Sequence, residues 1–351
     1  MKILMTGDWQ VNGRRDDYMS MLEACVDYFL SVVVKTEPDF VVNLGDVMDT
    51  KNLVDVEDLV WAYQSVNKIS NLVPQKNPSH WTPKPRHVIL KGNHDLSDKN
   101  GNVASIQVME SDNTRICMHA EILHMGPLRV MVLPYTENIE GTYKWIEQQT
   151  SPPHVIIGHV DWIGCRLTPA YVSKNGFDPA WFHERFPGVP IFNGHYHHPM
   201  SLGNLHMVGS PVHKDFNDVV GPIERGFTLW DSETGTIERI PNPCTYYCLQ
   251  LTYENEDSLE SGWKELRSMA ENLRVKVFVP NKLLADAKEM FKDFLWSAVI
   301  PIESDAISLQ HASEVTVQST KAEVLQKGVD AAPDEYDKEM LYSLGRQVFG
   351  V

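Results

Sequence analysis

Short apolar runs alternate with longer amphipathic segments between residues 2 and 240, a pattern typical of an α/β fold. Two of the longer segments repeat apolar residues at helical spacing and predict helices over Tyr18–Lys35 and Asp55–Val73, each packed on a sheet. The short runs have the length of buried strands. They are Lys2–Thr6, Asp39–Leu44, His87–Lys91, Arg129–Leu133, His154–Ile157, Pro190–Asn193 and Leu205–Val208.

Beyond this core the pattern changes. Gly226–Ile240 predicts a hairpin, and the proline-bracketed connector Pro241-Asn242-Pro243 follows it. A strand–helix–strand–helix series then predicts a small second domain. Its elements are expected at Tyr246–Thr252, Ser258–Asn272, Val275–Val279 and Leu283–Leu295.

The C-terminal part of the chain is polar and weakly periodic over residues 303–333, which predicts a linker. Asp334–Phe349 predicts one amphipathic helix. We therefore expect a main domain over residues 1–243, a small α/β domain over 244–302, a linker over 303–333 and a C-terminal helix over 334–351.

Composition narrows the class of protein. A chain of 351 residues, 42% hydrophobic and 22% charged, can bury two cores. Its five cysteines are scattered without a C-x-x-C pair, which favours reduced thiols over a disulfide framework or a thiolate metal site. The early Gly7-Asp8 pair argues against a signal peptide, and no apolar run approaches the roughly 20 residues that span a bilayer. We expect a cytoplasmic protein without a membrane segment.

Five of the predicted strands end in a glycine-containing turn that carries potential metal ligands. The junctions are Gly7-Asp8-Trp9-Gln10, Gly45-Asp46, Gly92-Asn93-His94-Asp95, Gly158-His159 and Gly194-His195-Tyr196-His197. Ligands gather at the carboxyl ends of strands in α/β sheets, so these side chains are expected to meet at one edge. Carboxylate, imidazole and amide groups without a thiolate suit divalent ions such as manganese, iron or zinc.

Each junction also has a structural explanation when it is taken alone. A glycine before Asp46 or His159 is a common strand-to-turn transition, and the segment after Gly194 could be an exposed polar turn. The three polar residues Asn93-His94-Asp95 directly after a buried strand are costly to fold unless something uses them. Five such junctions in one chain favour a shared metal site over coincidence.

Over residues 1–230 the series resembles the calcineurin-like metallophosphoesterase superfamily, whose pattern runs D-x-H, GD, GNH[DE], GH and GHxH. The resemblance implies a two-sheet sandwich flanked by helices, a small α/β capping domain and two divalent metal ions. It divides the expected ligands into two sets around a shared carboxylate. They are Asp8, Gln10 and His197 for the first ion, Asn93, His159 and His195 for the second, and Asp46 between the two.

By the same match, His94 faces the substrate and stabilises or protonates the leaving oxygen, oriented by a hydrogen bond from Asp95. Gln10 departs from the pattern, since the superfamily usually has histidine there. An amide oxygen can bind a hard ion such as manganese but is a weaker donor than imidazole. The sequence leaves open whether Gln10 is a ligand or whether water completes that site.

The segment Met207–Phe227 resembles the corresponding segment of SbcD-type nuclease subunits, and the chain is most similar to the small versions that tailed phages carry for recombination. The resemblance implies a manganese-dependent DNA exonuclease and endonuclease, with magnesium as the other candidate ion. It acts on double-stranded ends in recombination and repair, in the host cytoplasm if it is phage-encoded.

The same resemblance implies two protein partners, an SMC-like coiled-coil ATPase that docks on residues 334–351 and a second copy of the chain in a homodimer. A net charge of −16 is unusual for a protein that binds DNA directly, and an ATPase that makes much of the DNA contact would explain it. Arg14 and Arg15, close to Asp8, are the candidate DNA contacts of this chain.

Two alternatives to the nuclease stay open. A phosphomonoesterase of the same superfamily would hydrolyse p-nitrophenyl phosphate and leave DNA intact. A catalytically weak adaptor would bind DNA ends and the ATPase without metal-dependent cleavage, and Gln10 would then be the first ligand position to have been lost.

Overall fold

A computed structural model describes residues 1–13, 16–49, 54–73, 85–97, 101–168, 171–214, 224–269, 273–294 and 296–302. They form two compact units, Met1–Gln250 with Ala270–Val275, and Leu251–Met269 with the described residues from Lys276 onward. The predicted linker 303–333, the C-terminal helix 334–351, Arg14 and Arg15 lie outside the described residues. The predicted domain bounds at 243 and 302 stay a prediction.

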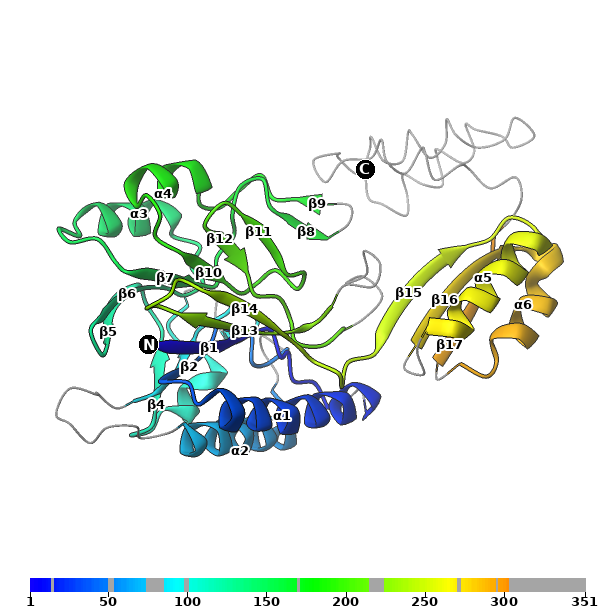
Figure 1. Ribbon diagram of the computed structural model, residues 1–351, viewed down its shortest axis with the longest axis horizontal. Helices are drawn as coiled ribbons and strands as arrows, with labels where there is room; N and C mark the ends of the chain where they lie inside the picture. The colour runs from blue at the N-terminus through cyan, green and yellow to red at the C-terminus, as the bar shows by residue number, and fades with distance from the viewer. Residues whose placement is uncertain are drawn as a thin grey trace, which may run out of the picture. The chain divides into compact units, whose positions relative to one another are not determined.

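Two six-stranded sheets form the centre of the first unit (Figure 1). The first contains the parallel strands β1 (Lys2–Thr6), β2 (Phe40–Asn43), β3 (His87–Leu90) and β4 (Thr114–Cys117), and the hairpin β13 (Gly226–Asp231) and β14 (Ile237–Pro241). Its order is β14-β13-β1-β2-β3-β4. The antiparallel hairpin pairs with β1, so the parallel strands occupy one side of this sheet.

The second sheet has a parallel centre and antiparallel edges. Its strands are β5 (Glu121–Met125), β6 (Leu128–Leu133), β7 (Val155–Gly158), β10 (Ile191–Asn193), β11 (Met200–Leu202) and β12 (Leu205–Met207). The order is β11-β12-β10-β7-β6-β5, with β5 and β11 antiparallel to their neighbours. A short hairpin of β8 (Arg166–Thr168) and β9 (Tyr171–Val172) follows β7.

Helices cover the outer face of each sheet (Figure 1). α1 (Asp16–Thr36) and α2 (Val56–Leu72) lie over the first sheet, α3 (Ile139–Glu147) and α4 (Pro179–Arg185) over the second. Along β1 the side chains alternate, since Leu4 packs in the core beneath α1 and α2 while Ile3 and Met5 pack between the sheets. Strands buried on both faces require the uninterrupted apolar runs seen in the sequence. The predicted two-sheet sandwich flanked by helices is confirmed.

Several elements were not predicted from the sequence. They are β4, β5, β8, β9, β11, α3, α4 and, in the second unit, β17 (Trp296–Ile302). β5 is half-exposed along most of its length, and α4 spans only seven residues. Such short or partly exposed segments carry too few apolar positions to establish a period.

A third sheet has the order β15-β16-β17, where β15 is Tyr247–Thr252 and β16 is Leu273–Pro280. The helices α5 (Glu256–Met269) and α6 (Leu284–Phe291) belong to the second unit. The predicted helix Leu283–Leu295 is shorter, because a 3-10 turn precedes α6 and the helix ends at Phe291. None of the described helices has the length and hydropathy that a membrane crossing requires.

His87, the first residue of β3, makes the stability of the first unit depend on pH. It is fully buried with Nδ1 2.9 Å from Ser70 Oγ, and burial lowers its pKa from 6.5 to about 4. The unfolded chain therefore binds more protons than the folded one in this interval. The stabilisation is complete above about pH 6.5 and is lost as the pH falls towards 4, by about 3 kcal/mol.

Urea unfolding at pH 7 and pH 4.5 tests this expectation, with His87→Gln as the non-titrating comparison. The free energy of unfolding should fall more steeply with acid in the wild type than in the variant. Equal slopes would contradict the assignment to His87.

Candidate metal centre

The five ligand-bearing junctions meet at one edge of the sandwich. In the first sheet, Thr6 pairs with Asn43 and Asn43 with Ile89, so β1, β2 and β3 end side by side. In the second sheet, Asn193 pairs with Gly158, so β10 and β7 end together. The turns that follow these strands bring seven side chains from distant parts of the sequence into one connected cluster.

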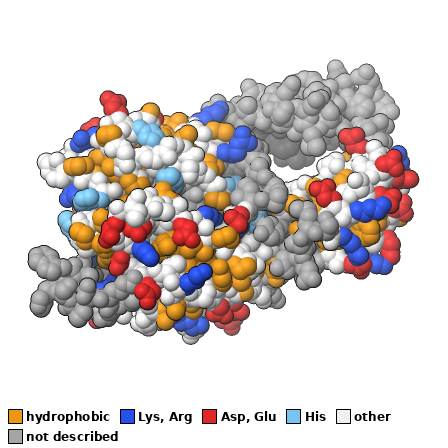
Figure 2. All heavy atoms as spheres, viewed as in Figure 1, with side chains coloured by type: hydrophobic (Ala, Val, Ile, Leu, Met, Phe, Trp, Pro, Cys, Tyr) orange, Lys and Arg blue, Asp and Glu red, His pale blue; other side chains and the backbone are white. Residues whose placement is uncertain are grey.

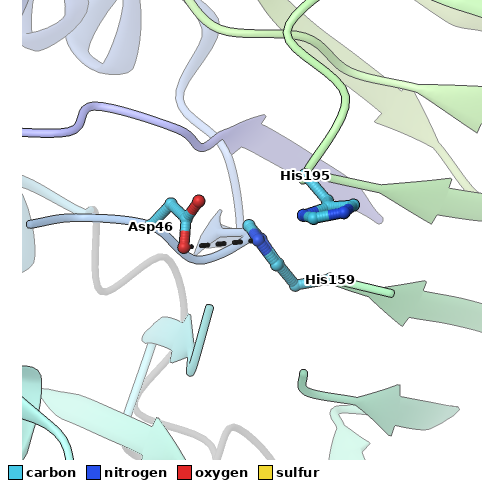
Figure 3. A group of neighbouring side chains, drawn as sticks. All are labelled: Asp46, His159 and His195. Atoms are coloured by element: carbon cyan, nitrogen blue, oxygen red, sulfur yellow. Dashed lines mark ion pairs between the residues drawn. The ribbon is translucent and has the colours of Figure 1, made fainter. Parts of the chain in front are cut away.

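Four side chains form the inner part of this cluster: Asp46, Asn93, His159 and His195. Nε2 of His159 lies 3.4 Å from Asp46 Oδ1 and 3.3 Å from Asn93 Oδ1. Nδ1 of His195 lies 2.9 Å from the same Asn93 oxygen. Figure 3 shows Asp46 from the first sheet facing the two imidazoles from the second. These ligand atoms surround a point at which one cation could be bound.

Asp8, Gln10 and His197 adjoin this inner set. Oδ1 of Asp8 accepts the backbone N–H of His195 at 3.0 Å. The side-chain amide nitrogen of Gln10 lies 3.3 Å from Asp46 Oδ2 and 3.1 Å from His197 Nε2. All seven side chains expected to hold metal are therefore brought together, with Asp46 between the two sets.

The second nitrogen of each inner imidazole is bound in a way that fixes its tautomer. Nδ1 of His159 lies 2.6 Å from the Leu44 carbonyl, which can only accept, so the proton is on Nδ1. Nε2 of His195 donates to Asp161 Oδ1 at 3.0 Å. With these protons in place, the other nitrogen of each ring faces Asn93 Oδ1, which is itself an acceptor. Acceptors this close repel one another unless a cation or a proton lies between them.

Electrostatics in the cluster favour positive charge at the same point. Burial would lower the pKa of His159, but Asp46 outweighs it and raises the pKa to about 9. Burial would raise the pKa of Asp46, but His159 holds it below the usual range. Asp46 is therefore ionised at neutral pH. Burial raises the pKa of Asp8, because the nearby His159 and His197 offset the loss of hydration of this carboxylate only in part.

The backbone is strained where ligands are presented. Asp8, Gln10, Asp46 and His195 have φ of 52°, 48°, 53° and 69°, and among the described non-glycine residues only Glu37 shares this conformation. Each costs about 1–3 kcal/mol, which the surrounding fold must offset. At Gly92 any side chain would be excluded by lack of space, since a Cβ there would lie 2.1 Å from Asp46 Oδ1.

Two buried oxygens in the cluster fit a metal ion. Oδ2 of Asp8 and Oε1 of Gln10 have no hydrogen-bond partner among the described residues, although such groups are costly to bury unpaired. Rotating the Gln10 amide by 180° would exchange its oxygen and nitrogen and present Oε1 towards His197 and Asp46. Carboxylate, imidazole and amide donors suit the divalent ions that the sequence predicted.

His94 lies beside the cluster, but its orientation differs from the prediction. Its Nδ1 donates to the carbonyl oxygen of Asp49 at 2.8 Å, and Asp49 Oδ1 is 3.5 Å away. The Asp95 carboxylate accepts the backbone N–H groups of Asp46, Gly92 and Met48 at 2.9, 2.9 and 3.0 Å. Asp95 therefore fixes the loops that carry the ligands. The prediction that Asp95 orients the His94 ring by a hydrogen bond is therefore wrong. The ring is held by the carbonyl oxygen of Asp49 instead.

Two further residues of the site, Asp161 and Asp49, were not singled out by the sequence. Asp161 orients His195, and Asp49 is itself held by Asn12 Nδ2 at 2.7 Å and by the Lys214 ammonium group. Asp161 stands two residues after His159, and Asp49 three after Asp46. These short spacings were the available signal, but isolated aspartates near a turn are too common to be distinctive.

Replacing Asp161 by asparagine is expected to weaken metal binding about 10- to 100-fold, because His195 loses the carboxylate that fixes its tautomer and orientation. Calorimetric titration with Mn²⁺ measures the effect. Asp112→Asn, in an exposed turn, is the matched control and should bind as the wild type does. Unchanged affinity in Asp161→Asn would show that His195 is not a ligand.

A two-sheet sandwich with a metal-ligand cluster at its carboxyl-terminal edge defines a metallophosphoesterase. The family model for calcineurin-like phosphoesterases matches residues 1–199, and the chain belongs to this family. Over 362 residues it is 22% identical to exonuclease subunit 1 of Enterobacteria phage T4, covering 99% of this chain and 98% of that protein. Among solved structures, Yfce, a phosphoesterase from E. coli, is 11% identical, with 69% of this chain and all of that chain covered and a TM-score of 0.33.

Proposed function

We propose that this chain is the nuclease subunit of a complex that processes DNA ends, and that it hydrolyses phosphodiester bonds with two divalent metal ions. The observation that carries the proposal is similarity to a phage exonuclease subunit over nearly the whole of both chains, together with the cluster of seven potential ligands. A relative named as a subunit also supports a protein partner, which we propose to be an SMC-like coiled-coil ATPase.

Mn²⁺ is the proposed ion, with Mg²⁺ as the alternative, since both accept carboxylate and amide oxygens and the histidines favour manganese. When bound, such ions activate water and neutralise charge on the phosphate. Asp46, Asn93 and Asp8 would hold them at the ends of β2, β3 and β1. Rigid strand ends fix these groups, so little reorganisation accompanies the reaction.

His94 is the residue placed to move a proton. With its Nδ1–H on the Asp49 carbonyl, the ring leaves Nε2 to face the substrate. When Nε2 carries a proton, His94 donates a hydrogen bond or that proton to the leaving sugar oxygen. Lys214 pairs with the Asp49 carboxylate and so helps to hold Asp49 beside the His94 ring.

DNA contact by the partner ATPase fits the charge distribution. Figure 2 shows acidic and basic side chains interspersed over the second unit, where Glu260–Lys264 and Glu289–Lys292 are ion pairs along the helices. Paired surface charges leave little net attraction for a phosphate backbone. Arg14 and Arg15 stay candidate DNA contacts of the chain.

A homodimer is proposed through α2. Val56, Val60 and Tyr63 recur at spacings of four and three residues, so they share one face, and they are 73%, 47% and 43% exposed. A Val60→Glu variant should be monomeric in sedimentation while the wild type is dimeric. Equal sedimentation of the two proteins would remove α2 from consideration as the interface.

The decisive assay measures degradation of linear duplex DNA with Mn²⁺ or Mg²⁺, with and without the ATPase, beside hydrolysis of p-nitrophenyl phosphate. We expect metal-dependent loss of nucleotides from the ends. Hydrolysis of p-nitrophenyl phosphate without DNA cleavage would identify a phosphomonoesterase. No metal-dependent cleavage of either substrate, even with the ATPase, would identify an adaptor.

A further inference from the structure

A cavity of about 250 Å³ lies beside the metal-ligand cluster. None of the proposed metal ligands, nor His94, is among its lining residues. Lys91, at its wall, directly precedes the Gly92-Asn93 turn, and Tyr135 follows β6 on the opposite sheet. The two are joined by a hydrogen bond from the Tyr135 N–H to the Lys91 carbonyl at 2.9 Å. The Tyr135 ring centroid is 6.2 Å from that of His195. The cavity and the cluster therefore share a wall.

The lining combines aromatic surface with a few polar groups. Tyr135 and Trp145 supply half-buried aromatic rings, Thr136 is half-buried and Asn138 is exposed. Lys91 is only 4% exposed, and its ammonium group donates to the Gly101 carbonyl at 3.1 Å. Aromatic side chains with a few polar groups, next to a centre proposed to act on phosphate, match the chemistry of a nucleotide.

We propose that this cavity receives the base and sugar of one unpaired nucleotide beside the scissile phosphate. The inference rests on the proposed nuclease function and adds the form of substrate that the site takes. Pockets for drug-sized ligands hold roughly 300–1,000 Å³. A cavity of about 250 Å³ accepts one base with its sugar but not a base pair.

The size of the cavity restricts how a duplex end can be cleaved. The terminal base pair must open before its phosphate reaches the metal cluster, and unpairing is easiest at a mismatched end. Stacking on Tyr135 and Trp145 would compensate for the lost pairing. The enzyme is therefore selective for frayed or single-stranded ends, without reading the identity of the base.

The test uses the full chain, with its ATPase if duplex cleavage requires it. Oligonucleotide duplexes that differ only at the terminal nucleotide of the cleaved strand carry a paired base, a mismatched base or an abasic sugar. The mismatched end should be cleaved fastest, and the abasic end, which is equally unpaired, about 10-fold more slowly than the mismatched end. Bis(p-nitrophenyl) phosphate, which has no base or sugar, reports the hydrolytic centre alone.

Ala120→Phe fills the cavity from its lining, and Ala180→Phe makes the same exchange at an exposed position on α4. Ala120→Phe should lower kcat/KM for oligonucleotides about 10-fold and abolish the preference for a base over an abasic sugar. Hydrolysis of bis(p-nitrophenyl) phosphate should stay within about twofold of wild type in both variants. If Ala120→Phe does not fold, Thr136→Trp, at another residue of the lining, is used to fill the cavity instead.

Two results would overturn the inference in distinguishable ways. Equal cleavage of normal and abasic ends by the wild type, or normal selectivity in both filled variants, would show that the cavity does not take the base. Hydrolysis of bis(p-nitrophenyl) phosphate with no cleavage of any oligonucleotide would overturn the proposed nuclease function, and the inference with it.

Discussion

Replacing Asp46 by asparagine is expected to lower kcat/KM for phosphodiester hydrolysis about 10³-fold or more, roughly 4 kcal/mol of transition-state stabilisation. Asp46 lies between the two proposed ligand sets, within 3.4 Å of both the Gln10 amide nitrogen and His159 Nε2. Asparagine has nearly the same shape and keeps an oxygen for the His94 N–H, but it lacks the charge that a shared ligand requires. The loss should appear in Mn²⁺-dependent hydrolysis of bis(p-nitrophenyl) phosphate and in metal affinity.

Asp39→Asn is the matched control for this variant. Asp39 precedes the same strand, β2, at its opposite end and accepts the Lys2 N–H at 2.8 Å. It should retain activity and metal binding within about twofold, and both variants should unfold cooperatively. A fully active Asp46→Asn protein would show that Asp46 does not bridge metal ions.

Replacing His94 by alanine is expected to lower kcat about 10²- to 10⁴-fold, while Mn²⁺ binds with nearly wild-type affinity. His94 is held by the Asp49 carbonyl outside the inner set of proposed ligands, so its loss should remove the proposed proton donor and leave the cluster intact. Turnover and calorimetric metal affinity, measured on the same preparation, separate these two roles.

His124→Ala, at an exposed position on β5, is the control and should change neither quantity. The size of the loss should also depend on the leaving group. A substrate with a good leaving group such as p-nitrophenol needs less proton donation than a sugar hydroxyl, so His94→Ala should impair it less. A parallel loss of metal affinity and turnover would instead make His94 a ligand.

The fold and the ligand residues could be predicted from the sequence because both depend on local patterns. Strands such as β1 and β3 are buried on both faces and are therefore continuous apolar runs, and each ends at a glycine that marks where the turn begins. Two predicted α helices, α1 and α2, are long enough for their spacing to be plain. Short elements such as α4 and the exposed β5 depend on tertiary packing that a single sequence does not display.

The residues that orient the ligands were harder to predict, because their partners are distant in sequence. From the sequence, Asp95 is predicted to orient His94, whereas the turn directs the Asp95 carboxylate to three backbone N–H groups. Asp49 occupies the expected place instead, across the turn from His94. Strain at Asp8, Gln10, Asp46 and His195 could not be predicted either, since Asp and His favour positive φ more than most residues but rarely adopt it.

The number of Mn²⁺ ions bound per chain, measured by calorimetry and by metal analysis after dialysis, tests the shared metal centre most directly. Two ions are predicted for the wild type, with the one held by Asn93, His159 and His195 bound more tightly than the one beside Gln10. An Asp46→Asn chain should lose at least one of them. A folded wild-type protein that takes up only trace metal, or the same two ions in both proteins, would contradict a metal centre built around Asp46.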